Sequence, residues 1–282
     1  MLNPTFKFLI FPLLIGVIAP SAVSANENKY PVRVISLSPS ATEDLFAIGA
    51  GKQVIAVDDN SNFPIGIPRT KLSSFNPNAE AIAKYRPDLV IIQKTATKAQ
   101  AVIGQLRKLK IKVYIEETPS NLSGLYKEIN DLANLTGNTG RAKVVISRIK
   151  SARLAAIAKN SRKGESFYHE LDNTLYSATS NTFIGKVYSD FGLVNIADAA
   201  AKADDGGYPQ LQNEYVISAN PKFIFLSDSQ YGENAESVAK RPGWSSIAAV
   251  KNNKVISLPA DIASRWGPRI ADFYQLIANA LS

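Results

Sequence analysis

The sequence predicts two α/β lobes, each built on a parallel sheet, joined by one long helix. The first observation is a repeated phrase: "NPNAEAIAKYRPDLVII" begins at Asn76, and "LQNEYVISANPKFIFL" begins at Leu211. In each phrase a Glu precedes a Pro, and an apolar run follows that Pro. Proline disfavours helix at the residue before it, and an unbroken apolar run is typical of a strand buried on both faces. Each phrase therefore predicts a helix, a stop and a buried parallel strand.

The second observation is the segment between the two phrases, residues 139–164. Apolar residues recur there at helical spacing, at Val145, Ile149, Ala152 and Ala156. No proline interrupts them and Gly164 supplies a stop, which predicts a helix of about 23 residues, roughly 34 Å long. This helix would bridge a lobe of residues 31–138 and a lobe of residues 165–282. The alternative is one continuous doubly wound sheet, because parallel sheets also repeat helix-then-strand phrases.

The remaining elements recur in the same order in both halves, which favours two lobes. "RVISLSPSATEDLFAIGAGKQVIAV" predicts a strand, a helix capped by Ser or Thr and closed by Gly49 or Gly51, and a short strand. "SATSNTFIGKVYSDFGLVNIA" predicts a helix closed by Gly192 and a short strand in the second half. "LRKLKIKVYIEE" and "IAAVKNNKVISLPAD" match each other further along. Each half is a complete unit of about one hundred residues.

The first 25 residues have the composition of a secretory signal peptide. Lys7 is their only charge, residues 8–20 are apolar, and "SAVSAN" offers a cleavage site after Ala25. The mature protein is therefore expected to be extracytoplasmic and soluble. An uncleaved membrane anchor is the alternative, although Pro12 and Gly16 interrupt the apolar run.

Composition excludes several classes of function. The sequence has no cysteine, which excludes disulfides, thiol catalysis, cysteine metal sites and a diacylglyceryl anchor, and so favours a Gram-negative periplasm. The net charge of +8 suggests nucleic acid, but the lysines are scattered, with no basic run or aromatic ladder, so no nucleic-acid partner is expected. An enzyme is not expected either, because "GxSxG", Walker and "HExxH" motifs are missing and the sequence has one His. Carboxylate pairs are the main catalytic option that remains, but adjacent carboxylates in loops are usually solvated or cap a helix.

Four stretches of the chain resemble a known family. "RVISLSPSATEDLFAIGAG", "NAEAIAKYRPDLVII", "NEYVISANPKFIFL" and "RPGWSSIAAVKNNKVISL" resemble the substrate-binding proteins of ABC importers for vitamin B12 and ferric siderophores. The resemblance covers nearly all of the mature chain, and "SPSATE" followed by "LFAIGAG" is similar to the cobalamin-binding members. It implies two Rossmann-like lobes joined by one rigid helix, with the ligand in the cleft between them. The ligand would be a cobalt corrinoid or a ferric chelate, no separate cofactor is expected, and the protein would act as a monomer.

The resemblance also gives the repeated phrase a purpose. In this family a surface Glu on each lobe docks into arginine pockets of the two permease subunits, and the matching positions are Glu80 and Glu214. Carboxylates bind arginine bidentately, and the first turn of a helix favours an acidic residue. The alternative is that each Glu only supports its own helix. With Asn76 as cap and Pro77 at the first helical position, Glu80 falls one place beyond the capping-box position. Helix capping is therefore a weak explanation of Glu80.

The candidate ligand site lies on the loops that follow the predicted strands, because open α/β sheets bind ligands beyond the carboxyl ends of their strands. These loops supply Ser38, Asp59, Phe63, Phe75 and Gln93 in the first half, and Glu170, Asp228, Arg265 and Trp266 in the second. Aromatic side chains with a few polar groups suit a large planar ligand. Arg265 and Trp266 are expected to be exposed before the last helix, although a packed Trp at the lobe edge is the alternative. Trp244 is expected to be structural.

Other ligands and another role remain open from the sequence. "SNFP" stands where cobalamin binders often carry a "CDYP" loop, and anionic siderophore oxygens would suit Arg265, Arg269, Tyr176 and Tyr231. Haem would need an axial ligand, for which His169 is available, although a solvent-facing loop is expected there. Direct metal capture would need more nitrogen ligands than one His provides. A receptor that reports to a membrane sensor, rather than to a permease, is the alternative of another class.

Overall fold

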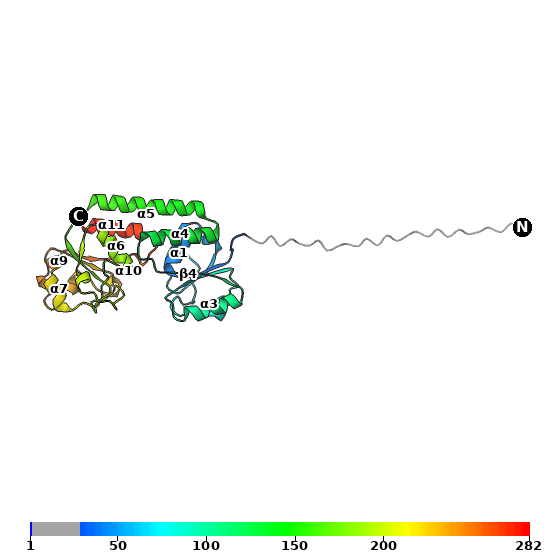
Figure 1. The fold of residues 1–282 in the computed structure, drawn as a ribbon, viewed down its shortest axis with the longest axis horizontal. Coiled ribbons are helices and arrows are strands. Elements are labelled where there is room, and N and C mark those ends of the chain that lie inside the picture. The colour runs from blue at the N-terminus through cyan, green and yellow to red at the C-terminus, as the bar shows by residue number, and fades with distance from the viewer. Residues whose placement is uncertain (2–28) are drawn as a thin grey trace.

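The computed structural model describes Met1 and residues 29–282, so the predicted signal peptide and its cleavage site lie outside the described residues. Two separate four-stranded sheets are present, with strand orders β2-β1-β3-β4 and β6-β5-β7-β8 (Figure 1). The two-lobe prediction is confirmed, and the single continuous sheet is wrong. Within the described part of the chain, no helix is long and apolar enough to cross a membrane.

The first lobe alternates strands and helices. Its elements are β1 (Val34–Leu37), α1 (Pro39–Ala47), a 3-10 turn (Gly51–Gln53), β2 (Val54–Val57), α2 (Ala79–Ala83), β3 (Leu89–Gln93), α3 (Ala99–Lys108), β4 (Lys112–Glu116) and α4 (Leu122–Thr136). All neighbouring strands are parallel, and β1 pairs with β3 from Val34↔Leu89 to Leu37↔Ile92. The apolar run of the first repeated phrase is thus an inner strand of the sheet, as predicted.

The second lobe repeats this topology with more short helices. Its elements are β5 (Ser166–Glu170), α6 (Phe183–Asp190), β6 (Val194–Asn195), α7 (Asn213–Ala219), β7 (Phe223–Leu226), α8 (Ala235–Ala239), α9 (Ala248–Lys251), β8 (Val255–Ser257), α10 (Ala260–Ser264) and α11 (Ile270–Ala280), with 3-10 turns at Ile196–Ala199, Ser229–Tyr231 and Trp244–Ser246. Strand β7, from the second repeated phrase, pairs with β5 and β8. It occupies the same place in its sheet as β3 does in the first lobe.

Both faces of each sheet are covered, which explains the unbroken apolar runs. In β3, Leu89 and Ile91 join one hydrophobic cluster, while Val90 and Ile92 join another with residues of α2 and α3. Strand β7 divides in the same way, and its second face packs against α7, α8 and α9. Successive strand residues point to opposite faces, so a strand between two helical layers needs an apolar residue at every position.

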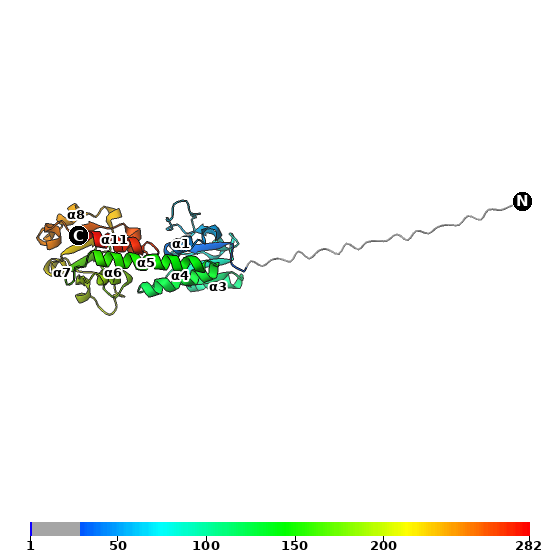
Figure 2. The same cartoon turned by 90° about the horizontal axis from the view of Figure 1, so that it is seen from above.

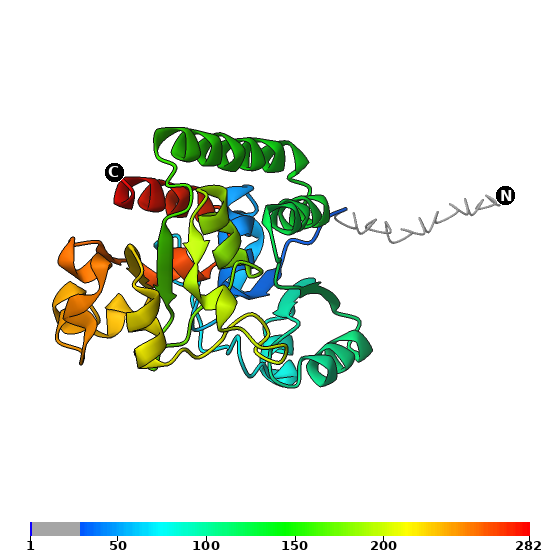
Figure 3. The same cartoon turned by 60° about the vertical axis from the view of Figure 1, so that its left-hand side comes forward.

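The bridging helix α5 (Thr139–Lys159) spans both lobes (Figures 1 and 2). It is shorter than predicted, because the backbone turns extended at Asn160, four residues before Gly164. The Asn160 side chain donates to the carbonyl of Ala278 at 2.7 Å, which ties the end of the helix to α11. Figure 3 shows α11, in red, alongside α5. The fully buried positions of α5 are Ala142, Ile149 and Ala156, one every two turns.

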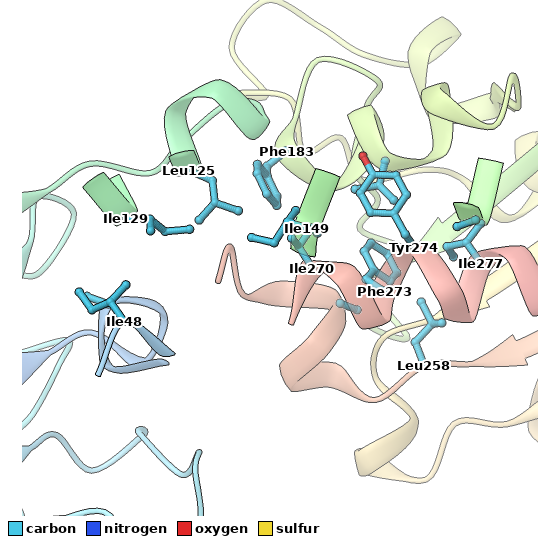
Figure 4. Packing of buried hydrophobic residues seen from close by; sticks show 14 of the residues in the cluster. Ile48, Leu125, Ile129, Ile149, Phe183, Leu258, Ile270, Phe273, Tyr274 and Ile277 are labelled. Atoms are coloured by element: carbon cyan, nitrogen blue, oxygen red, sulfur yellow. The ribbon is translucent and has the colours of Figure 1, made fainter. Parts of the chain in front are cut away.

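One hydrophobic cluster runs through both lobes and α5. Figure 4 shows Ile48, Leu125 and Ile129 of the first lobe on one side of Ile149, and Ile270, Phe273 and Ile277 of α11 on the other. Interiors are close-packed and resist changes of volume, so this shared core restrains the angle between the lobes. The helix α5 therefore packs into the core of both lobes and holds them at a fixed angle, and we call it a packed spine in this sense.

Candidate ligand cleft

A hollow of about 430 Å³ lies between the lobes, beyond the carboxyl end of β4. The first lobe contributes Thr118, Pro119 and Ser120, and the second lobe contributes Thr179, Asn181, Thr182, Phe183, Asp198, Ala201, Lys202, Gly206, Gly207 and Tyr208. A cleft between the lobes at strand ends is the predicted location. The nine residues predicted to bind ligand do not line this hollow. The hydroxyl-rich and amide-rich stretch "SATSNT" before α6 was the signal that sequence reasoning missed.

The loop at residues 179–182 is held by its own hydrogen bonds. The Thr182 hydroxyl caps α6 by accepting from the Gly185 amide at 3.0 Å, and it donates to the Thr179 carbonyl at 2.8 Å. The Thr179 amide in turn donates to the carbonyl of Gly207 at 2.9 Å. A Cβ at Gly185 would lie 2.0 Å from the Thr179 carbonyl oxygen, so only glycine fits there. The cleft wall is therefore pre-formed.

The predicted residues of the first lobe gather at the ends of β1, β2 and β3. Ser38 is fully buried and caps α1 by accepting from the Ala41 amide at 3.3 Å, while Gln93 donates to the same hydroxyl at 3.3 Å. Asp59 is half-buried, and its amide donates to the Leu72 carbonyl. Phe63 and Phe75 are 40% and 69% exposed. The aromatic pair is thus accessible, while the polar residues mainly shape the loops.

Glu170 and Asp228 are buried inside the second lobe. Glu170 ends β5, and both of its carboxylate oxygens accept from Arg241 at 2.6 Å. Arg241 also binds Glu233 at 2.7 Å. Burial raises the pKa of Glu170 to about 7, although the hydrogen bonds from Arg241 lower it. Burial also raises the pKa of Asp228, whose two oxygens have no hydrogen-bond partner among the described residues.

His169 does not lie in a solvent-facing loop as predicted. It lies within β5, is fully buried, and its Nδ1 is 2.8 Å from the Tyr188 hydroxyl. Burial lowers the pKa of His169 to about 3, which keeps the imidazole neutral. The sequence misplaced this residue because "SFYHE" mixes polar and apolar residues, yet its last four residues are all buried. A fully buried ring inside a strand is a poor axial ligand for haem iron.

Arg265 and Trp266 are half-buried at the junction of the lobes, so the expectation that they are exposed is wrong. The Trp266 indole donates to Glu116 of β4 at 3.2 Å and packs against the shared hydrophobic cluster. Arg265 reaches Glu43 of α1 at 3.1 Å and Asp261 at 2.8 Å. The turn before α11 is thus drawn against the first lobe by ion pairs and one indole hydrogen bond, which a reading of local sequence did not include.

Exposed aromatic side chains collect on the strand-end loops of both lobes. Phe63 and Phe75 follow β2, Tyr176 follows β5, Tyr208 follows β6 and Tyr231 follows β7, and all five are exposed. Tyr208 also lines the hollow between the lobes. Because the carboxyl ends of parallel strands meet at one edge of each sheet, these exposed aromatic side chains belong to the loops at that edge.

Glu80 and Glu214 occupy equivalent positions, each the second residue of its helix, α2 and α7. The cap of α2 is Asn78, which accepts from the Ala81 amide at 2.8 Å, so the prediction of Asn76 as cap is wrong by two residues. Both glutamates are exposed, and neither forms an ion pair with any described residue. In Figure 1, α7 lies on the side away from α5, as does α3, against which α2 packs.

Residues 34–262 match the model of the periplasmic binding protein family. The chain belongs to this family. It is 28% identical over 284 residues to the uncharacterized ABC transporter substrate-binding lipoprotein YvrC of Bacillus subtilis, covering 98% of this chain and 87% of that protein. It is 29% identical over 245 residues to the vitamin B12-binding protein of Vibrio vulnificus, covering 84% of this chain and 85% of that protein. The periplasmic heme binding protein HutB of Vibrio cholerae has the same fold, with a TM-score of 0.77, 22% identity, and coverage of 88% of this chain and 98% of that chain.

Membership confirms the predicted resemblance and the fold. The protein is a substrate-binding protein of the family that serves ABC importers for B12 and ferric siderophores, and this family binds solutes rather than catalysing reactions. That role implies a small-molecule ligand and a permease partner. The named relatives differ in ligand.

Proposed function

We propose that this protein captures a cobalt corrinoid outside the cytoplasm and delivers it to the permease of an ABC importer. The observation that carries the proposal is the set of exposed aromatic side chains on strand-end loops of both lobes. A corrin ring is a large planar group, and aromatic faces from two sides of a cleft bury it without fixed charge. The B12-binding relative from Vibrio vulnificus supports the same ligand class.

The polar lining of the cleft favours a corrinoid over an anionic chelate. Most of its polar groups are neutral hydroxyls and amides, at Thr118, Ser120, Thr179, Asn181 and Thr182. The two charged residues of the lining, Asp198 and Lys202, carry charges of opposite sign, and the Asp198 carboxylate accepts a hydrogen bond from the Ser180 amide at 2.7 Å. Carboxamides on the rim of a corrin can exchange hydrogen bonds with such groups. Haem propionates and acidic siderophores would instead gain most from free guanidinium groups.

Tryptophan fluorescence tests the ligand directly, because the two tryptophans occupy different places. Trp244 is buried in the core of the second lobe, whereas Trp266 lies between the lobes. The mature protein and its Trp266→Phe variant would be titrated with cyanocobalamin, haem and a panel of ferric siderophores. Saturable quenching by cyanocobalamin alone, weaker in the variant, is expected. Quenching only by haem or a ferric chelate would reassign the ligand, and no binding across the panel would overturn the proposal.

Docking to the permease is assigned to Glu80 and Glu214. Their exposure, their equal position in α2 and α7, and the repeat of helix and strand around them support this assignment. Two equivalent carboxylates on one chain suit a partner with two-fold symmetry, so one monomer would engage both permease subunits. Export through the predicted signal peptide, residues 1–25, would place the protein on the correct side of the membrane; fractionation of cells expressing the full chain would test this.

Charge reversal separates docking from ligand binding. The double variant Glu80→Lys/Glu214→Lys is expected to lose transport in a reconstituted importer while keeping its ligand affinity. Glu236→Lys is the matched control, because Glu236 is also exposed in the first turn of a short helix, where it pairs with Lys240. A loss of ligand affinity in the double variant, or equal loss of transport in the control, would contradict the assignment.

A further inference from the structure

Glu43 joins the two lobes through a buried cluster of charges. Its side chain is 1% exposed, and it accepts from Arg269 at 2.8 and 2.5 Å and from Arg265 at 3.1 Å. These partners lie 222 and 226 residues away, in the turn before α11. Arg265 also pairs with Asp261 at 2.8 Å, so two carboxylates balance two guanidinium groups. Such a balance matters because an unpaired charge in this position would be costly.

Both guanidinium groups reach the loop that carries one of the candidate ligand aromatics. Arg265 donates to the side chain of Asn62 at 2.7 Å and to the carbonyl of Asn60 at 3.1 Å. The Arg269 guanidinium lies 4.3 Å from the centroid of the Phe63 ring, whose side chain is 40% exposed. Cations stack on aromatic faces at this distance. The two arginines therefore contact the inner side of the candidate binding surface around Phe63, and Glu43 compensates part of their positive charge.

We propose that Glu43 is a positioning residue that sets the charge selectivity of the candidate binding surface around Phe63. It does not face the ligand; it occupies the two arginines that would otherwise attract carboxylates toward Phe63. Specificity is a difference of affinities, and withholding a favourable partner from the wrong ligand is one way to build it. Replacing Glu43 by the neutral Gln leaves one uncompensated positive charge beside Phe63. The inference rests on the proposed function, since it concerns which chelates the cleft accepts.

The state of the arginines can be measured without any ligand. Phenylglyoxal, an arginine-selective reagent, would be applied to the wild type, to Glu43→Gln and to Glu236→Gln, and the modified peptides identified by mass spectrometry. Arg269, which Glu43 holds bidentately, is expected to react slowly in the wild type and in Glu236→Gln, and at least about five times faster in Glu43→Gln, because a guanidinium held bidentately is protected. Arg265 should change less, because it keeps its contacts with Asp261, Asn62 and Asn60. Equal rates in all three proteins would overturn the proposal.

Selectivity itself is read from the ratio of two dissociation constants, for cyanocobalamin and for haem. Glu43→Gln is expected to shift this ratio at least about tenfold toward haem, with a stronger salt dependence of haem binding. Glu43→Gln/Arg269→Gln should return the ratio toward the wild type. Should Glu43→Gln fail to fold, Glu43→Asp, whose shorter carboxylate cannot reach both arginines, should shift the ratio in the same direction by less. If the wild type binds cyanocobalamin and Glu43→Gln has the same ratio of dissociation constants as the wild type, the role of Glu43 is refuted while the proposed function stands. A wild type that binds neither probe would refute the proposed function.

Discussion

Ile149→Ala tests whether α5 is a packed spine. Ile149 is 1% exposed and lies in the cluster that contains residues of both lobes. The substitution removes three carbon atoms, a loss of about 2.4 kcal/mol at about 0.8 kcal/mol per buried methylene. A residual cavity adds to this loss, and the better helix propensity of Ala offsets it by about 0.4 kcal/mol. We expect a loss of about 3 kcal/mol in the free energy of unfolding.

Urea unfolding is the appropriate assay, followed by tryptophan fluorescence and by far-ultraviolet circular dichroism. Val144→Ala on the same helix is the matched control, because Val144 is 62% exposed and should change stability by less than about 0.5 kcal/mol. If the lobes share one core, the Ile149 variant should shift the fluorescence and dichroism transitions together. Equal stability of the two variants, or two separate transitions already in the wild type, would refute the view of α5 as a spine.

Three further outcomes follow from single sites. Burial raises the pKa of Glu128 to about 12 from its ordinary 4.5, so the folded state holds the proton more tightly and stability is lost as pH rises above 4.5; in pH-dependent urea unfolding, Glu128→Gln should remove this loss, which reaches up to about 1.4 kcal/mol per pH unit. A parallel pH dependence in both proteins would contradict it. Gly185→Ala should displace the loop at Thr179, with a cost of at least about 1 to 3 kcal/mol and weaker cyanocobalamin binding by calorimetry; an unaltered protein would contradict the close contact. Phe75→Ala should leave stability within about 0.5 kcal/mol while lowering cyanocobalamin affinity about tenfold, and unchanged affinity would remove Phe75 from the binding surface.

The strands and the two-lobe plan were predictable because their signals are local and repeated. The runs "LVII" and "FIFL" need no knowledge of distant residues, since a strand covered on both faces must be apolar throughout. The end of α5 was harder to predict. Nothing between Lys159 and Gly164 forbids helix, and the helix ends where Asn160 finds the Ala278 carbonyl, a partner 118 residues away. Contacts of that range leave no local trace in a single sequence.

The candidate site was predicted less well for the same reason. The strand-end loops, from which the candidate residues were taken, contain the exposed Phe63 and Phe75. Polar residues at strand ends, however, divide between those that face the cleft and those that find a partner inside the protein. Glu170 finds Arg241, and Arg265 finds Glu43, each across more than 70 residues. The pairing of charges decides which side chains stay free, and pairing is a property of the fold.

The repeated phrase and the bridging helix together determine where Glu80 and Glu214 lie relative to each other. Placing α2 and α7 before the same strand of two equal sheets puts Glu80 and Glu214 in equivalent settings, but equivalence alone does not fix the distance between them. That distance depends on the angle between the lobes, which the cluster around Ile149 restrains. When two contacts belong to one rigid body, forming the first makes the second nearly intramolecular, so each contact can be weak on its own. If Glu80 and Glu214 dock to the permease as proposed, a substitution that loosens the core around Ile149 should therefore weaken overall docking while leaving each single carboxylate contact unchanged.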